Sequence, residues 1–164
     1  MDVLTVTLIV ATLLCALTAG LVFAFSSIVM PGLTKLDDKG FIRAFQMIDG
    51  VIQAGQAAFG VVWVGSLVAI IVAAALAVLQ LDGVMRAVTV TSAIWYIVGV
   101  QIPTFTVNIP LNNALQRLDV ERMNADALHD ARRAFEPRWV RWNLIRTINA
   151  CAVSLALMVI LVGL

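Results

Sequence analysis

The residues best suited to chemistry are polar side chains set within long apolar runs. One group comprises Trp139, Trp142, Asn143 and Arg146. Their spacing of three, one and three residues places them on one face of a helix or at its edge. An arginine beside an amide can hold an anionic oxygen, with the tryptophans as a stacking wall. The alternative is that Arg146 reaches lipid phosphates and the tryptophans form an interfacial belt.

Further polar residues lie toward the same ends of the neighbouring apolar segments: Gln46, Asp49, Gln101, Asn108 and Asn112. Polar groups inside a membrane bundle are costly, so they tend to face its interior and to mark function. These side chains therefore predict a polar pocket, unless they form a hydrogen-bonded plug that fixes the register of the helices. Asp49 is a candidate general base whose pKa partial burial would raise, or else a boundary charge.

Other kinds of site find little support in the sequence. His129 is the only histidine, and we expect it in a solvated loop. Cys15 and Cys151 form no CxxC motif, so we expect neither a metal site nor a cofactor. The arginines of segment 117–146 are balanced by five acidic residues, which favours a surface near anionic lipid and not a nucleic-acid site.

The elements that must position these residues are membrane-spanning helices. Only 13% of the 164 residues are charged and 62% are hydrophobic, whereas a soluble domain carries roughly 25% charged residues. Four intervals hold no charged residue, namely 3–34, 50–81, 87–116 and 147–164. A helix needs about 20 mainly apolar residues to cross a bilayer, and each interval is close to this length or longer. This pattern excludes a soluble enzyme, a nucleic-acid-binding domain and a disordered chain.

We therefore predict an all-α protein with one domain, an antiparallel up-down bundle of four transmembrane helices. The spans cover about 3–29, 50–80, 87–113 and 139–163. The third span contains Pro103 and Pro110, so we expect it to kink near Gln101 and to continue beyond the membrane. We also expect a short cytoplasmic helix capped by Asn124, followed by a new helix that begins near Pro137.

The positive charges predict the orientation of the bundle. Loops one and three hold ten of the eleven Lys and Arg residues, and the connection between spans two and three holds only Arg86. Because retained loops are enriched in Lys and Arg, these two loops should be cytoplasmic and both termini outside. The expected partners are membrane lipids and a lipophilic small molecule. Whether the chain forms a homo-oligomer or joins a membrane complex is left open.

Several short motifs resemble those of the anthrone oxygenase-like family of four-span membrane proteins. In chain order they are Phe23-Ala24-Phe25, Val29-Met30-Pro31-Gly32-Leu33, Phe45-Gln46-Met47-Ile48, Asn108-Ile109-Pro110-Leu111-Asn112 and Trp142-Asn143-Leu144-Ile145-Arg146. The most specific are N-x-P-L-N and W-N-x-x-R, at the inner ends of spans three and four. The resemblance covers nearly the whole chain.

The resemblance implies chemistry at the inner leaflet. Some fungal members look like cofactor-independent monooxygenases that convert an anthrone to an anthraquinone, whereas most bacterial members have no assigned activity. Such chemistry would assign Arg146, Asn143, Asn108 and Asn112 as donors to an oxyanion and Trp139 or Trp142 as a wall. Asp49 and His129 are the candidate bases, and neither lies in a motif that matches the family's pattern. The alternative is a membrane protein without catalytic activity that binds a small apolar ligand or serves as an accessory subunit.

Overall fold

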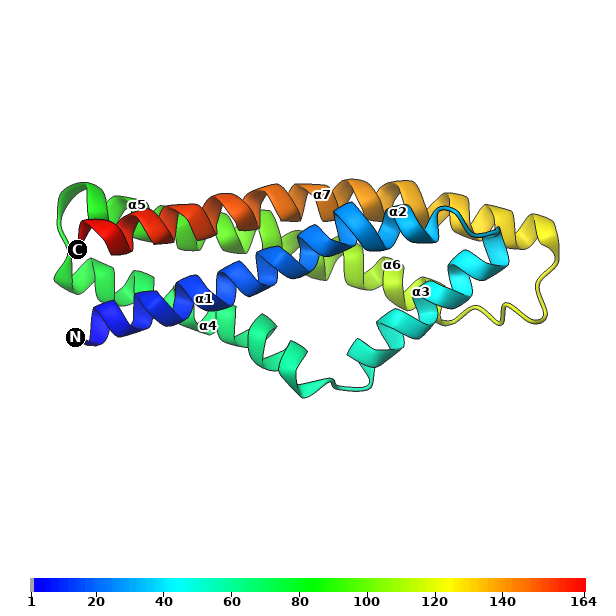
Figure 1. Cartoon of the computed structure of the whole chain (residues 1–164), viewed down its shortest axis with the longest axis horizontal. Coiled ribbons are helices and arrows are strands. Elements are labelled where there is room, and N and C mark those ends of the chain that lie inside the picture. Colours follow the sequence, from blue (N-terminus) through cyan, green and yellow to red (C-terminus); the bar gives the residue numbers. More distant parts are fainter. Residues whose placement is uncertain (1) are drawn as a thin grey trace.

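The computed structural model describes residues 2–164, and in this part of the chain helices are joined by short connections, with no β-strand. Four helical stretches are long and apolar enough to cross a membrane: Val3–Leu33, Ala57–Gln80, Gly83–Gln116 and Ala125–Gly163. They lie side by side in one elongated bundle with both termini at the same end (Figure 1). This confirms the predicted all-α membrane bundle, and the chain is a multi-pass membrane protein.

The first and third stretches are interrupted by π-helical turns. The first contains α1 (Val3–Ala24), η1 (Phe25–Val29) and α2 (Met30–Leu33). The third contains α5 (Gly83–Tyr96), η2 (Ile97–Gln101), η3 (Thr104–Asn108) and α6 (Ile109–Gln116).

Each π-helical turn ends two residues before a proline, at Pro31, Pro103 and Pro110. A proline ring clashes with the carbonyl of the preceding turn and offers no N–H, and a wider turn accommodates both effects. The disturbance expected near Gln101 is therefore present as a π-helical turn, and no break in the helix is needed.

Helix α3 (Asp38–Gln53) is separate from helix α4 (Ala57–Gln80), although we expected one span from about residue 50. Gly55 has a positive φ of 82°, a conformation that favours glycine. Gln56 then caps α4, because its side-chain oxygen accepts a hydrogen bond from the Phe59 N–H at 2.9 Å. The two helices consequently meet at an angle beside the bundle (Figure 1), and Gln46 and Asp49 belong to α3.

Helix α7 (Ala125–Gly163) is continuous over 39 residues with Pro137 inside it. Asn124 caps this helix as expected, since its side chain accepts a hydrogen bond from the Ala127 N–H at 2.9 Å. The short helix predicted after Asn124 thus forms, but it runs on into the fourth span, and the expected helix start near Pro137 is wrong. Pro137 lies on the exposed side, and the buried residues Leu128, Phe135 and Trp139 form one face that continues across it.

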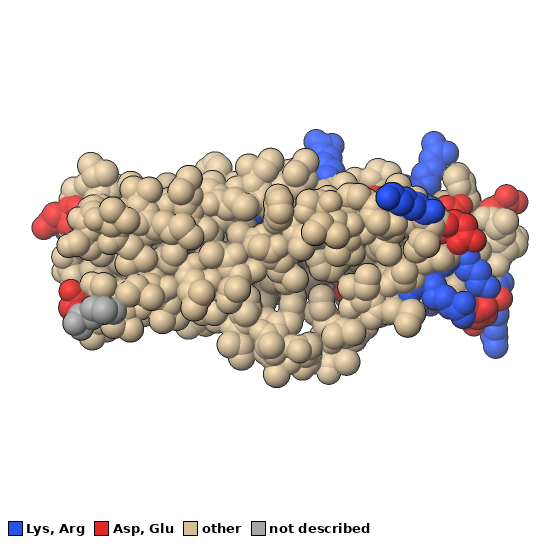
Figure 2. Space-filling model, in the orientation of Figure 1, with Lys and Arg blue, Asp and Glu red and all other residues tan. Residues whose placement is uncertain are grey.

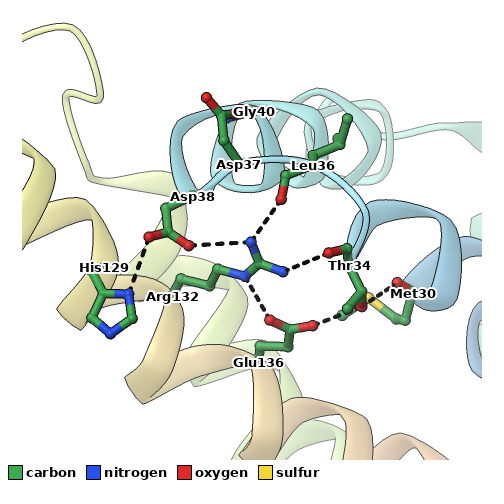
Figure 3. Close-up of polar contacts among 9 residues, drawn as sticks. All are labelled: Met30, Thr34, Leu36, Asp37, Asp38, Gly40, His129, Arg132 and Glu136. Atoms are coloured by element: carbon green, nitrogen blue, oxygen red, sulfur yellow. Dashed lines mark hydrogen bonds and ion pairs between the residues drawn. The ribbon is translucent and has the colours of Figure 1, made fainter.

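The turn between α2 and α3 is held against α7 by Arg132, whose side chain is 14% exposed (Figure 3). Its guanidinium donates to Glu136 Oε2 at 2.7 Å, the Leu36 carbonyl at 2.8 Å, the Thr34 carbonyl at 3.1 Å and Asp38 Oδ1 at 3.2 Å. The Arg132 guanidinium also lies over the Phe41 ring, 4.5 Å from its centroid. This cluster fixes where α3 begins. It belongs to the charged end of the bundle, which lies opposite the termini (Figure 2).

Candidate functional site

A cavity of about 340 Å³ lies between α1, α3, α4, the η3–α6 segment and α7. Its volume is within the range of small-molecule sites, roughly 300 to 1,000 Å³. Aromatic side chains form much of its wall: Phe25, Phe45, Phe59, Trp63, Phe105 and Trp139. The Trp139 ring is central, with centroid distances of 5.7 Å to Phe25 and 5.5 Å to Phe45. Such walls suit a flat, apolar ligand.

Arg146 supplies a positive charge to this cavity. It is only 5% exposed, so it does not extend to lipid phosphates. Its Nη1 donates to Thr104 Oγ1 at 2.9 Å and its Nη2 donates to Asn143 Oδ1 at 2.7 Å, while Nε has no partner in the described part of the chain. No carboxylate within residues 2–164 forms an ion pair with it. Buried charges are normally paired. Arg146 is an exception, because its positive charge has no carboxylate partner within these residues.

Asn143 holds the Arg146 side chain in place. The Asn143 Nδ2 atom donates to the Val22 carbonyl at 2.9 Å and to Ser26 Oγ at 2.6 Å. A carbonyl can only accept, so the amide nitrogen must face α1 and the amide oxygen must face Arg146. The Val22 carbonyl lies in the last turn of α1 before the π-helical turn η1. Asn143 therefore connects α1 to the guanidinium on α7.

Asp49 lies on another wall of the same cavity and is 4% exposed. Its Oδ1 accepts a hydrogen bond from Asn112 Nδ2 at 2.8 Å, and its Oδ2 accepts one from Gln53 Nε2 at 2.6 Å. Asn112 Oδ1 in turn accepts a hydrogen bond from Trp139 Nε1 at 2.7 Å. Burial raises the pKa of the Asp49 carboxyl, and the two amide donors only partly oppose this effect. A carboxylate so held can accept a proton from a ligand in the cavity.

The charged groups lie at different depths. Asp49 is connected through Asn112 to Trp139, and Arg146 follows Trp139 by seven residues on α7. At 1.5 Å per residue this separation corresponds to about 10 Å along the helix. Arg146 is the farther of the two from the charged end of the bundle. The Arg146 guanidinium carbon lies 5.8 Å from the Trp139 ring centroid and bonds to Thr104, whereas Asp49 bonds to Asn112, eight residues further along the same segment. The cavity therefore has a proton acceptor nearer the charged end and a cation farther from it.

Six of the nine predicted site residues line the cavity: Asp49, Asn108, Asn112, Trp139, Asn143 and Arg146. Asn108 Nδ2 donates to the Trp139 carbonyl at 3.4 Å, and within the described chain its Oδ1 has no partner. The sequence thus brings together the residues that we expected to meet, although they come from three separate helices, α3, η3–α6 and α7.

Three predicted residues lie elsewhere. Gln46 donates to the Leu115 and Leu118 carbonyls and so fastens the end of α6 to α3. Gln101 accepts a hydrogen bond from Trp63 Nε1 at 3.2 Å, beside the cavity. Trp142 precedes Asn143 by one residue, which turns it about 100° away from the lining face. The candidate base His129 is exposed and lies 3.2 Å from Asp38, away from the cavity.

We did not predict from the sequence that Gln53 would hydrogen-bond to Asp49. We also did not predict that Phe59, Trp63 and Phe105 would line the cavity. The spacing of four residues between Asp49 and Gln53 is a signal that could have indicated their contact on one helix. The aromatic residues gave no comparable signal, because an aromatic side chain in an apolar span is equally compatible with ordinary packing.

The fold defines a multi-pass membrane protein, and its bundle encloses a cavity with aromatic walls. The chain belongs to the anthrone oxygenase family, whose model matches residues 50–156. The matched part contains α4 to α6 and most of α7, and with them the Arg146, Asn143 and Asn112 side chains of the cavity. This confirms the resemblance seen in the motifs. No curated protein and no solved structure matches the chain.

Proposed function

We propose that the protein oxidises a planar, lipophilic aromatic compound at an activated CH2 group, with O2 as the oxidant and without a cofactor. One observation carries this proposal: the Asp49 carboxylate and the Arg146 guanidinium line one aromatic cavity, Asp49 beside Asn112 and Arg146 beside Thr104. A base and an anion-stabilising group so arranged could deprotonate a flat ligand at one end and hold its carbonyl at the other. Membership of the anthrone oxygenase family supports this kind of substrate.

In an anthrone the CH2 carbon and the carbonyl lie across the central ring from each other. Removal of a CH2 proton by Asp49 sends the negative charge through the ring to the carbonyl oxygen. Arg146 lines the cavity, and its buried Nε has no partner in the described chain. The guanidinium could donate to this oxygen, and preorganised donors at a developing charge are a large source of catalysis. Asn143 keeps the guanidinium in position through its own contact with Val22.

The carbanion then reacts with O2. It passes one electron to O2, and the resulting carbon radical and superoxide combine to form a C–O bond. The peroxide keeps one oxygen atom as a new carbonyl, and the second oxygen atom leaves with both hydrogens of the original CH2 as water. The substrate supplies all four electrons that reduce O2, so the reaction consumes no external reductant.

The test is aerobic turnover of anthrone in proteoliposomes, measured as anthraquinone formed above the protein-free rate. Asp49→Asn should lower kcat by roughly 10²- to 10⁴-fold, the usual contribution of a general base. Asp126→Asn is the matched control, because Asp126 is exposed on α7 and should leave turnover unchanged. Equal turnover by the wild-type protein and the Asp49→Asn variant would show that Asp49 is not the general base.

A second candidate is ligand binding without turnover. It is favoured by the contacts of Asn143 and Arg146, which connect α1, η3 and α7 and so could act mainly as a clamp between helices. A clamp predicts that loss of Arg146 lowers the thermal stability of the protein. A role in binding an anionic oxygen predicts that replacement of Arg146 lowers the affinity for the ligand.

We also infer that the charged end of the bundle faces the cytoplasm and that the termini face outside. Nine of the eleven Lys and Arg residues lie toward that end, whereas Arg146 is buried in the cavity and Arg86 lies at the opposite end. The positive-inside rule then sets the orientation. The cavity would accordingly open at the inner leaflet, where a lipophilic compound made in the cytoplasm would be dissolved.

A further inference from the structure

The outer edge of the cavity is mostly apolar. Four of its lining residues are exposed at the molecular surface: Gln53, Val64, Phe105 and Ile109. Val64 is 60% exposed and Phe105 is 57% exposed. Both belong to stretches that are apolar enough to cross the membrane, so their exposed surfaces contact lipid. The edge of the cavity formed by these residues therefore borders the bilayer.

The packing of the helices explains why an opening exists there. Helix α4 packs on α1 and α5, whereas α3 packs on α6 and α7. The bend at Gly55 joins these two sets, and the cavity lies between them. Figure 2 shows the surface hollowed beside this bend. On the α4 side the wall is stiffened by Phe59 and Trp63, whose rings stack 5.5 Å apart.

We propose that ligands enter the cavity from the bilayer through a lateral portal between α4 and η3, with Val64 and Phe105 as its two sides. The portal also selects the chemical class of the ligand, an inference that rests on the proposed function. An anion would incur a large desolvation penalty at this apolar edge, whereas the unpaired Arg146 stabilises an anion inside. The ligand is therefore a neutral weak acid that enters uncharged and loses its proton within the cavity.

The portal can be tested without any ligand by labelling a thiol placed inside the cavity. Leu21→Cys introduces this thiol on the α1 wall, in a background with Cys151→Ser to remove the exposed cysteine. Two reagents are compared in proteoliposomes: pyrene maleimide, which dissolves in the bilayer, and a charged methanethiosulfonate, which does not. The same background without Leu21→Cys measures the contribution of the buried Cys15.

Val64→Trp narrows the portal, and Val68→Trp is its matched control. Val68 is one turn further along α4, is 54% exposed and does not line the cavity. We expect pyrene maleimide to label the Leu21→Cys thiol faster than the charged reagent does. Val64→Trp should slow the pyrene labelling several-fold, while Val68→Trp should leave it unchanged. Equal rates for the two tryptophan variants, faster labelling by the charged reagent, or no labelling at position 21 would each overturn the portal.

This experiment is independent of the proposed oxidation. Oxidation of anthrone without an effect of Val64→Trp on labelling would overturn the portal but not the proposed function. The expected labelling pattern without turnover would overturn the proposed oxidation but not the portal.

Discussion

Arg146 donates a hydrogen bond from Nη2 to the Asn143 side-chain oxygen at 2.7 Å, one turn earlier on α7, while its Nε donates to no group in residues 2–164. The arginine is therefore held in position but not neutralised. A buried cation without an anionic partner is unfavourable in the empty protein, and a ligand that brings an anionic oxygen would relieve this cost.

Replacement of Arg146 should consequently separate binding from stability. We expect Arg146→Met to weaken the binding of a phenolate-type aromatic ligand by about 1.5 to 3 kcal/mol, the usual range for a hydrogen bond to a charged group. Its melting temperature should be unchanged or higher, because a buried charge is removed. Arg141→Met, on the exposed side of the same helix, should change neither quantity. A lower melting temperature with unchanged affinity would support the clamp.

The raised pKa of Asp49 predicts two opposite pH dependences. Turnover should rise with pH as Asp49 loses its proton and becomes able to act as a base, with a midpoint above the ordinary carboxyl value. Stability should fall over the same interval, from about pH 4 up to the raised pKa, because the folded protein binds the proton more tightly than the unfolded chain does. Melting curves across this range check the sign. Asp49→Asn should abolish the pH dependence of turnover and remove the contribution of Asp49 to the pH dependence of stability.

The Arg132 cluster predicts that the charged end of the bundle supports the site from a distance. Arg132→Gln should lower the free energy of unfolding by about 1 to 3 kcal/mol, because Asp38 and Glu136 lose a buried partner. It should also weaken ligand binding, since α3 carries Phe45 and Asp49 into the cavity. Arg133→Gln is the matched control, because the neighbouring Arg133 is less buried and forms no ion pair within the described chain. Equal unfolding curves for the two variants would contradict this role.

The orientation of the bundle can be read from single cysteines in a background without Cys15 and Cys151. We expect a cysteine at exposed Ala125 to react with a membrane-impermeant maleimide only after the cells are permeabilised. A cysteine at Val84, which is 76% exposed at the opposite end, should react in intact cells. The reverse labelling pattern would show that the charged end of the bundle faces outside.

The membrane bundle was predictable because its cause is visible along the chain. Intervals without charge are a one-dimensional signal, and the cap at Asn124 follows from local chemistry. The break at Gly55 and the continuity through Pro137 were not foreseen. The first depends on a positive φ, and the second depends on a buried face that outweighs the lost hydrogen bond of the proline.

The site was predictable in its polar residues and not in its walls. Asp49, Asn112 and Arg146 stand out because polar groups are rare and costly in such segments. Gln46 and Gln101 stand out for the same reason, yet neither lines the cavity: Gln46 bonds to the Leu115 carbonyl and Gln101 bonds to Trp63 Nε1. Composition indicates that a polar group is buried, but the rotation of each helix decides where it points.

Removal of the CH2 proton can be measured separately from the reaction with O2. Anthrone is incubated with the protein in D2O without oxygen, and deuterium incorporation into its CH2 group is followed by mass spectrometry. We expect the wild-type protein to accelerate exchange above the protein-free rate. Asp49→Asn should return exchange to that rate, and Arg146→Met should slow it. Exchange that is equal with and without protein, or unaffected by Asp49→Asn, would show that Asp49 does not remove the CH2 proton.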